Sequence, residues 1–443
     1  MRTVNHKISL FVQAHGMALL VLAALFLARL LAMYSLGVQY TLWSDDTSYL
    51  RSGIYFAQHG VLTMHEEYPS AQIMPGMTWL IALFSLLFGE GRGLWMALKL
   101  LWSAMGTLTG WYLYRCVGLF APKWCGVAAM FCLFRADFLW MDNLILTETP
   151  FLLALTAMVY YTFRMGRFQD WHSFIGCLAA YLAGLLLKAN IALYPLFALA
   201  YLLCTQYDRK LLMKQCGIVA AAVLVFLIPW TARNYRQFHA FIPLTYGAGN
   251  PTLQGTYQGR GYPADEELDY ETNVEQPARQ RYAAYYQEDG TVQPRYQRYV
   301  SLGKDAIKAA YRQKVWWDRD WTAFLYSYLI AKPWQTMNEL FYWQRVLDVP
   351  GDRMALVQRM DLYFCALALA ASVILKKKRL PMLFLAGTYL ANVYIYSMTF
   401  AFGRYNASLM GLRFLMVGIG LSLVVQLARR GVESVEQFER DER

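Results

Sequence analysis

The sequence predicts an all-α polytopic membrane protein with about ten transmembrane helices, in a range of about nine to twelve. Of its 443 residues, 57% are apolar and 16% are charged, whereas soluble domains average about 45 to 50% apolar and about 25% charged residues. The mean hydropathy is +0.27, and apolar runs near the roughly 20 residues that a spanning helix needs recur along the chain. This composition excludes an ordinary soluble enzyme.

The apolar runs alternate with basic clusters, which mark the cytoplasmic side of a membrane protein. The runs lie at 8–36, 73–88, 94–114, 124–146, 149–165, 172–188, 190–206, 212–232, 355–375, 380–400 and 405–427. The clusters are Arg2/Lys7, Arg115/Lys123, Arg164/Arg167, Arg209/Lys210/Lys214, Lys376 to Arg379 and Arg429/Arg430. The net charge of +11 therefore reports orientation, and no nucleic-acid partner is expected.

Charge parity predicts the domain organisation. With Arg2 and Arg115 both inside, one of the runs 73–88 and 94–114 does not cross the bilayer. The remaining runs give seven spans before a large outside loop and three after it. The predicted parts are a transmembrane module at 1–232 with a first outside loop at 37–72, a large outside loop at 233–353, C-terminal transmembrane helices at 354–428 and a cytoplasmic tail at 429–443.

The large outside loop is predicted to fold as a cap over the active site. It is rich in tyrosine and carries Trp316, Trp317 and Trp321 near its end, whereas disordered segments are poor in aromatic residues. The seven cysteines of the chain form no CxxC pair, so the sequence encodes no disulfide framework or zinc site.

Two aspartates follow the first span. Ser44 is a favourable N-cap, Asp45 and Asp46 fall in a first helical turn and Gly60 is a favourable C-cap, so a short surface helix is predicted in the first outside loop. Successive residues of a helix are rotated by about 100°. At most one of the two aspartates therefore faces a site, and the other caps the helix; the alternative is that both do no more than cap.

Other polar elements stand at the outer ends of later runs. Pro75-Gly76 leads into the run that follows the first loop, Glu148 precedes another run, and Lys188-Ala189-Asn190 separates two runs. Ionisable residues at membrane depth are costly and are usually functional or paired. The alternative for each cation is a side chain that snorkels to the membrane interface.

The order of these elements resembles the GT-C superfamily of integral-membrane glycosyltransferases, and within it the family 39-like relatives of protein O-mannosyltransferases and lipid A aminoarabinose transferases. The matching pieces are Asp45 four residues before Tyr49, Pro75-Gly76, Glu148, Lys188-Ala189-Asn190, the segment Pro229 to Tyr235 and Arg404-Tyr405. The resemblance covers about residues 40–420 and implies the GT-C fold. The sequence departs from the family at Ile73-Met74, where relatives often carry a second proline or a basic residue, and at Glu148, where some carry aspartate.

The resemblance implies a hexosyl- or pentosyltransferase of the plasma (inner) membrane with its active site on the extracytoplasmic side. A sugar would pass, with inversion, from a polyprenyl-phosphate donor to a hydroxyl of a glycan, lipid or protein acceptor among membrane lipids. No nucleotide cofactor is expected, because Gly89 to Gly93 lacks the lysine of a phosphate loop. A divalent metal ion, held by Asp45 and Glu148, is left open.

The resemblance also implies roles for individual residues. Asp45 is the expected base, with Asp46 in reserve, and Glu148 orients the acceptor or binds the metal ion. The expected contacts of the donor phosphate are Lys188, Arg233, Arg404 and Tyr405. The expected contacts of the sugar or acceptor are Tyr49, Trp317 and Trp321.

Alternative interpretations remain at three places. Trp317 and Trp321 also suit a membrane interface. His65 with Glu66 and Glu67 suits a solvated loop better than a metal site. A transporter or flippase of lipid-linked sugars would also need charges within the membrane, although the sequence shows no second copy of the Asp-Asp or Lys-Ala-Asn elements, as inverted repeats would require.

Overall fold

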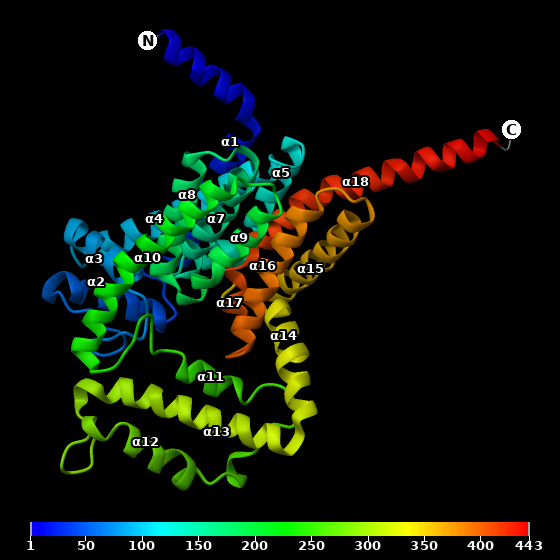
Figure 1. Ribbon diagram of the computed structural model, residues 1–443. Helices are drawn as coiled ribbons and strands as arrows, with labels where there is room; N and C mark the ends of the chain where they lie inside the picture. The colour runs from blue at the N-terminus through cyan, green and yellow to red at the C-terminus, as the bar shows by residue number, and fades with distance from the viewer. Residues whose placement is uncertain (1, 442–443) are drawn as a thin grey trace.

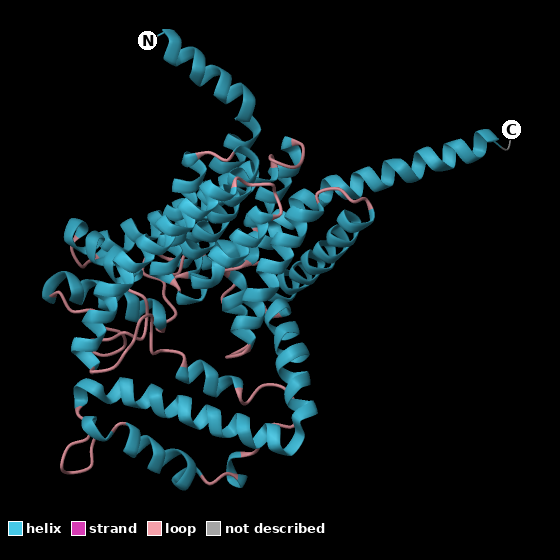
Figure 2. Ribbon diagram, in the orientation of Figure 1, coloured by secondary structure: helices cyan, strands magenta, loops and turns pink. Residues whose placement is uncertain are grey.

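The computed structural model describes residues 2–441, with side chains described for residues 11–429. Every named element in the described chain is a helix, and the extended pairing found there amounts to two isolated bridges, Met64 with Glu66 and Tyr286 with Val292. Figure 2 shows helices joined by loops, with no strand among the residues drawn as described. The prediction of an all-α protein is confirmed.

A bundle of long helices forms one part of the molecule (Figure 1). Helix α4 packs against α1 and α7, α7 packs against α8, and α18 packs against α15 and α16. The helices of this part are α1 (Arg2–Leu36), α3 (Gly76–Phe88), α4 (Arg92–Val117), α5 (Lys123–Phe131), α6 (Ala136–Met141), α7 (Glu148–Phe168), α8 (Trp171–Leu187), α9 (Tyr194–Leu203), α10 (Arg209–Phe238), α15 (Gly351–Ile374), α16 (Arg379–Ser397), α17 (Gly403–Ala407) and α18 (Met410–Asp441). A single large apolar cluster fills the space between them.

Four helices of the described chain are long and apolar enough to cross a membrane. They lie at Phe11–Leu36, Arg209–Phe238, Gly351–Ile374 and Met410–Arg429, and shorter apolar helices lie beside them. Large apolar side chains such as Leu20, Val225, Met360 and Ile374 are exposed on these helices, as expected where a helix faces lipid. The membrane character is confirmed, and the number of about ten spans stays a prediction.

The two apolar runs that compete for one crossing differ in length. Helix α3 has 13 residues and is roughly 20 Å long, less than the hydrocarbon core of about 30 Å, whereas the 26 residues of α4 reach about 39 Å. Helix α3 packs instead on α2 (Asp45–His59), where a Cβ on Gly53 would lie 2.4 Å from Ile81. By length alone α4 suits a crossing better than α3, and which of the two runs crosses stays a prediction.

The apolar run 124–146 is not one continuous helix. It divides into α5, a 3₁₀ turn at Cys132–Phe134 and α6, with Arg135 between the last two. The Arg135 guanidinium donates to the carboxylates of Asp137, at 2.8 Å, and of Asp361 on α15. The break thus supplies a buried cation that joins the first part of the bundle to its C-terminal helices.

A second layer of helices lies at the end of the bundle away from both ends of the described chain (Figure 1). We call residues 239–350 the cap. Its helices are α11 (Gly249–Gly255), α12 (Gln276–Arg281), α13 (Gln297–Tyr326) and α14 (Lys332–Asn338), with π turns at Glu271–Glu275 and Ser327–Ala331. Helix α10 continues to Phe238, so the boundary predicted at residue 232 falls inside a helix. The predicted tail from residue 429 is helical to Asp441, and residues 442–443 lie outside the described residues.

The cap has a buried centre of its own. The guanidinium of Arg312 on α13 is fully buried and donates to Thr256 Oγ1 at 2.8 Å, to the Pro263 carbonyl at 2.8 Å and to the Tyr270 hydroxyl at 2.7 Å. Asp265 supplies the counter-charge. Because a buried cation is stable only when it is paired and hydrogen-bonded, these contacts fix α13 to the turns beside it.

Candidate active site

The start of α2 is held by Asp46. Its carboxylate accepts hydrogen bonds from the backbone N–H groups of Leu42 (2.7 Å), Ser44 (3.1 Å) and Thr47 (3.0 Å) and from the Thr41 hydroxyl. Ser44 occupies the N-cap position without a side-chain cap among the described contacts, and Gly60 ends the helix at φ 70°. Asp46 is 2% exposed, and both its oxygens are already occupied by the protein. Asp46 therefore caps α2. It does not line the cavity described below, so its position does not suit the role of a reserve base.

The substitution Asp46→Asn is expected to lower stability and to leave the chemistry intact. The amide nitrogen of asparagine cannot accept the hydrogen bonds that one carboxylate oxygen now accepts, and each buried donor left unpaired costs about 1 to 3 kcal/mol. A thermal melt in detergent should show a lower midpoint than the wild type. The folded fraction should keep most of its turnover, and full stability combined with lost turnover would contradict this role.

Four charged side chains from distant parts of the sequence meet beside α2. Arg404 of α17 donates from Nη1 to Asp45 Oδ2 at 2.6 Å and from Nε to Glu148 Oε1 at 2.9 Å. Lys188, directly after α8, donates from Nζ to the same Glu148 oxygen at 2.9 Å. These distances are typical of charge-assisted hydrogen bonds. Two carboxylates and two cations thus form one connected group, which we call the charged cluster (Asp45, Glu148, Lys188 and Arg404).

Helix ends supply part of the stabilisation of this cluster. Asp45 is the first residue of α2 and Glu148 the first of α7, so each carboxylate lies where the helix dipole favours a negative charge. Lys188 follows the C-terminus of α8, where the dipole favours a positive charge. Nearby, Gly76 packs closely on the end of α8, where a Cβ would come within 2.6 Å of the Leu186 carbonyl oxygen. This contact explains why a glycine follows Pro75 at the start of α3.

The charged cluster borders a cavity of about 270 Å³. The lining residues are Asp45, Tyr49, Gln72, Ile73, Met74, Thr147, Glu148, Leu187, Lys188, Ala189, Asn190, Thr245, Tyr396, Arg404 and Tyr405. Glu148 Oε2 and the Tyr396 hydroxyl are buried and have no hydrogen-bond partner among the described residues. Because an unsatisfied buried polar atom is costly, both atoms are suited to bind a ligand.

Two of the predicted tyrosines also line this cavity. Tyr405 stacks on Tyr396, with ring centroids 4.5 Å apart and an interplanar angle of 12°. Tyr49 lies one turn along α2 from Asp45 and is 7% exposed. Burial raises the pKa of the Tyr49 hydroxyl, so this group keeps its proton and is a hydrogen-bond donor at neutral pH.

Three predicted contacts lie away from the cavity. Arg233 is near the end of α10, which carries it to the first outside loop, where Nη1 donates to the Ser70 carbonyl at 2.7 Å. Trp317 and Trp321 are on α13 of the cap, 46% and 56% exposed, with ring centroids 6.5 Å apart. None of the three lines the cavity, so the structure brings neither the predicted phosphate contact of Arg233 nor the predicted sugar contacts of the tryptophans to the charged cluster.

The carboxylates of the cluster are poorly arranged for a divalent ion. Asp45 and Glu148 both bind Arg404, and no group of three or more His, Cys, Asp or Glu side chains suited to a metal occurs within the described chain. Magnesium and calcium prefer several oxygen ligands around one centre. The donor set therefore does not fit the metal ion that the sequence left open.

His65 lies beside Asp45, although its sequence neighbourhood favoured a solvated loop. Its Nε2 is 3.7 Å from Asp45 Oδ1, and its Nδ1 is 2.9 Å from Ser48 Oγ. Its pattern with Glu66 and Glu67 gave no reason to connect it with α2. Tyr396 was missed as well, because one tyrosine in an apolar helix carries no distinguishing pattern.

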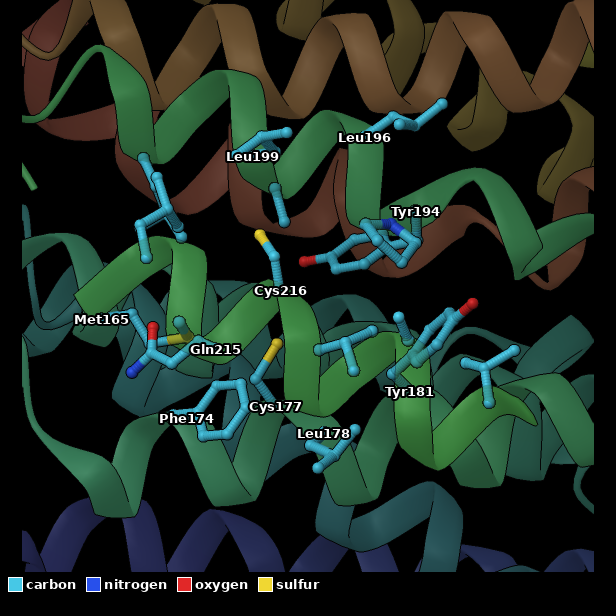
Figure 3. A pocket seen from close by; sticks show the side chains of 17 residues that line it. Met165, Phe174, Cys177, Leu178, Tyr181, Tyr194, Leu196, Leu199, Gln215 and Cys216 are labelled. Atoms are coloured by element: carbon cyan, nitrogen blue, oxygen red, sulfur yellow. The ribbon is translucent and has the colours of Figure 1, made fainter. Parts of the chain in front are cut away.

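An apolar cavity adjoins the polar one, and a second lies elsewhere in the bundle. One, of about 450 Å³, is lined by residues of α3, α4, α7 and α8 and shares Leu187 with the polar cavity. Another, of about 400 Å³, lies among α7, α8, α9 and α10. Figure 3 shows its apolar lining, including Phe174, Leu178 and Leu199, with Tyr181 and Tyr194 at one end. The polar cavity thus adjoins space suited to hydrocarbon.

A helical membrane bundle with a charged cavity at its cap end agrees with the fold that the resemblance to GT-C glycosyltransferases predicts. A family model described as dolichyl-phosphate-mannose-protein mannosyltransferase matches residues 70–232. This segment contains Glu148 and Lys188 of the charged cluster. The match covers well under half of the chain and supports the resemblance to GT-C glycosyltransferases over this segment.

One solved structure shows a similar fold at low sequence identity, and others are similar to a lesser degree. The archaeal oligosaccharyltransferase AglB from Archaeoglobus fulgidus, in complex with an inhibitory peptide and a dolichol-phosphate, is 13% identical with a TM-score of 0.50, over 94% of this chain and 52% of AglB. ArnT from Cupriavidus metallidurans, in the apo state and bound to undecaprenyl phosphate, is 16% identical with TM-scores of 0.43, over 93% and 92% of this chain and 78% of ArnT. No curated protein matches the sequence. At this identity the likeness to AglB shows the fold alone.

Proposed function

We propose that the protein transfers a sugar from a polyprenyl-phosphate donor to an acceptor hydroxyl at the outer face of the membrane. The observation that carries this proposal is the ion pair of Asp45 with Arg404, 2.6 Å long, in a cavity that Lys188 and Glu148 share. A base and two cations are the groups that this reaction needs. The donor class is supported by the description of the matching family, which names dolichyl-phosphate-mannose, and by the dolichol-phosphate bound to AglB.

The reaction is a single displacement at C1 of the sugar. Asp45 takes the proton of the acceptor hydroxyl, the acceptor oxygen bonds to C1, and the bond from C1 to the phosphate oxygen breaks. The electron pair of that bond leaves with the polyprenyl phosphate, whose charge becomes more negative. Attack from the face opposite to the leaving group inverts the configuration at C1.

The cations act on the leaving phosphate. Lys188 and Arg404 are held in place through Glu148 Oε1, so they need little reorganisation as negative charge develops on the phosphate. Arg404 also suits two oxygens of one phosphate group, because its guanidinium can donate from several N–H groups at once. The second oxygen of Glu148 accepts from a hydroxyl of the sugar or acceptor.

The adjoining apolar cavity suggests how a lipid-borne donor reaches these groups. The apolar cavity that shares Leu187 with the polar one accommodates the first isoprene units next to the phosphate. Helix α15 begins at the cap and ends before the basic turn Lys376 to Arg379, so this turn and the polar cavity lie at opposite ends of the bundle. Basic turns favour the cytoplasm, which supports an active site on the extracytoplasmic side.

The test is transfer by the purified protein in vesicles, with a panel of polyprenyl-phosphate sugars and of saccharide, lipid and peptide acceptors. We expect one donor to be cleaved to polyprenyl phosphate, with the sugar appearing on an acceptor in the opposite anomeric configuration by NMR. Movement of a donor across the bilayer without cleavage would favour a flippase. Neither cleavage nor movement of any donor would overturn the proposal.

A further inference from the structure

We propose that His65 receives the acceptor proton from Asp45 and releases it to solvent. This inference rests on the proposed function, in which Asp45 removes that proton. The two oxygens of Asp45 face different partners: Oδ2 accepts from Arg404 at 2.6 Å, and Oδ1 lies 3.7 Å from His65 Nε2. At 3.7 Å the two atoms are beyond hydrogen-bond distance, and the contact becomes an ion pair only when the ring is protonated. Such contacts in a site without substrate commonly tighten to hydrogen bonds in the reacting complex.

The backbone at His65 is held in a conformation that side chains rarely adopt. Its φ is +66°, in the left-handed region, and the flanking residues Met64 and Glu66 pair across it in an isolated bridge. The turn is anchored through Ser52, whose hydroxyl donates to the Thr63 carbonyl at 2.6 Å. Residues with positive φ cluster at functional sites, where the surrounding structure over-determines them. Here the turn points the imidazole at α2.

The hydrogen bond with Ser48 is compatible with a ring that accepts a proton at Nε2. Ser48, on the same face of α2 as Asp45, has its Oγ 2.9 Å from His65 Nδ1. If Nδ1 carries the hydrogen and donates to Ser48, Nε2 is left with a lone pair toward Asp45. Side chains of His65 and Asp45 are 30% and 34% exposed, so water reaches the pair and can remove the proton.

The electrostatic surroundings favour a neutral ring at pH 7. Burial lowers the pKa of His65 below its ordinary value, Asp45 acts in the opposite direction, and Arg298 of α13 lowers it further. Glu66 follows His65 in the sequence, but it is not among the groups that shift the pKa of His65. A neutral imidazole can accept a proton, whereas an imidazolium cannot.

A relay solves a problem that the Arg404 ion pair creates. When Asp45 takes the acceptor proton, its carboxylate charge is lost and the pairing with Arg404 weakens, at the moment when Arg404 must also face the leaving phosphate. Transfer of the proton from Asp45 to His65 Nε2 restores the carboxylate. The imidazolium then returns its proton to water, and the atoms and charges balance over one turnover.

Substitutions that keep the backbone conformation of the turn test the imidazole ring separately from the backbone. Glycine adopts positive φ readily and asparagine does so more often than other residues, so His65→Gly and His65→Asn preserve the left-handed turn and remove the proton acceptor. We expect each to lower kcat by about tenfold with the KM of the donor unchanged. Added imidazole should restore part of the turnover of His65→Gly. His59→Gln, at the exposed end of α2, is the matched control and should behave as the wild type.

The pH dependence of kcat distinguishes the relay from a purely structural role of His65, because a structural role would leave this dependence unchanged. Activity requires neutral His65, so wild-type kcat should fall as the pH drops through the lowered pKa of this histidine, below about 6.5. In His65→Gly this step should disappear from the profile. Wild-type kcat and an unchanged profile in both His65→Gly and His65→Asn would overturn the relay, while an inactive wild type would overturn the proposed function.

A second measurement needs no substrate. Diethyl pyrocarbonate modifies neutral imidazole, and mass spectrometry of the His65 peptide gives the pH midpoint of its modification. In Asp45→Asn the midpoint should move to lower pH, because the anion that favours the imidazolium is gone. The midpoint of His59 should stay in place. An unmoved His65 midpoint would show that the two side chains do not interact, and the relay would fail regardless of which sugar is transferred.

Discussion

Asp45→Asn is expected to lower the rate of sugar transfer by about 10³-fold, the largest effect of any single substitution considered for this protein. Asparagine keeps the size of the side chain, and its Oδ1 can still accept from Arg404, so the fold and the cluster survive. An amide cannot take a proton from a hydroxyl. Initial rates at saturating donor and acceptor, together with donor binding, would separate this chemical loss from a loss of affinity.

The control for this substitution is Asp352→Asn. Asp352 also lies in a first helical turn, that of α15, and is exposed. The helix dipole therefore stabilises its carboxylate as it does that of Asp45, but Asp352 does not line the cavity. We expect Asp352→Asn to transfer sugar at the wild-type rate. Wild-type turnover of Asp45→Asn would remove Asp45 as the base.

Arg404→Lys is expected to lower kcat by about 10²-fold. Lysine keeps the positive charge, but it is a point charge on a flexible stem and cannot reproduce the rigid fork that now binds Asp45 through Nη1 and Glu148 through Nε. Both carboxylates would lose part of their pairing, and the leaving phosphate would lose an aligned donor. Steady-state rates and donor KM, compared with the wild type, give the size of the loss.

The matched control is Arg260→Lys in the cap. Arg260 is exposed and stacks over the Tyr326 ring at 4.1 Å, so it tests the effect of exchanging arginine for lysine at a place remote from the charged cluster. Its turnover should equal that of the wild type. If Arg404→Lys also turned over at the wild-type rate, charge alone would suffice, and the forked geometry of Arg404 would have no part in the reaction.

Local chemistry made α2 predictable. Two carboxylates after Ser44 and a glycine at position 60 are signals that act within a few residues, and the helix runs from Asp45 to His59 as they indicate. The same rules showed that one aspartate at most could face a site. They could not say which, because the answer depends on the turn before the helix, where three backbone N–H groups and Thr41 converge on Asp46.

Apolar runs were a less certain guide to the bundle. Hydropathy identifies a segment that partitions into lipid, but it is insensitive to a break at Arg135, whose charge is compensated by Asp361 more than two hundred residues later. Helix α3 is as apolar as a span, but its 13 residues are fewer than a crossing usually needs, and one side of it packs on α2 and α8. Such outcomes depend on neighbours that a window of sequence does not contain.

The sequence by itself determined the class of the protein and the order of its polar elements. Long apolar runs with acids and bases at their outer ends require a membrane bundle that pairs those charges, since an unpaired charge at that depth is costly. Tertiary structure alone decided the partners: Arg404 reaches Asp45 and Glu148, His65 turns toward Asp45, and Arg233 stays with the first outside loop. The physical reason is that pairing depends on distances between helices, which packing sets and which no spacing along the chain records.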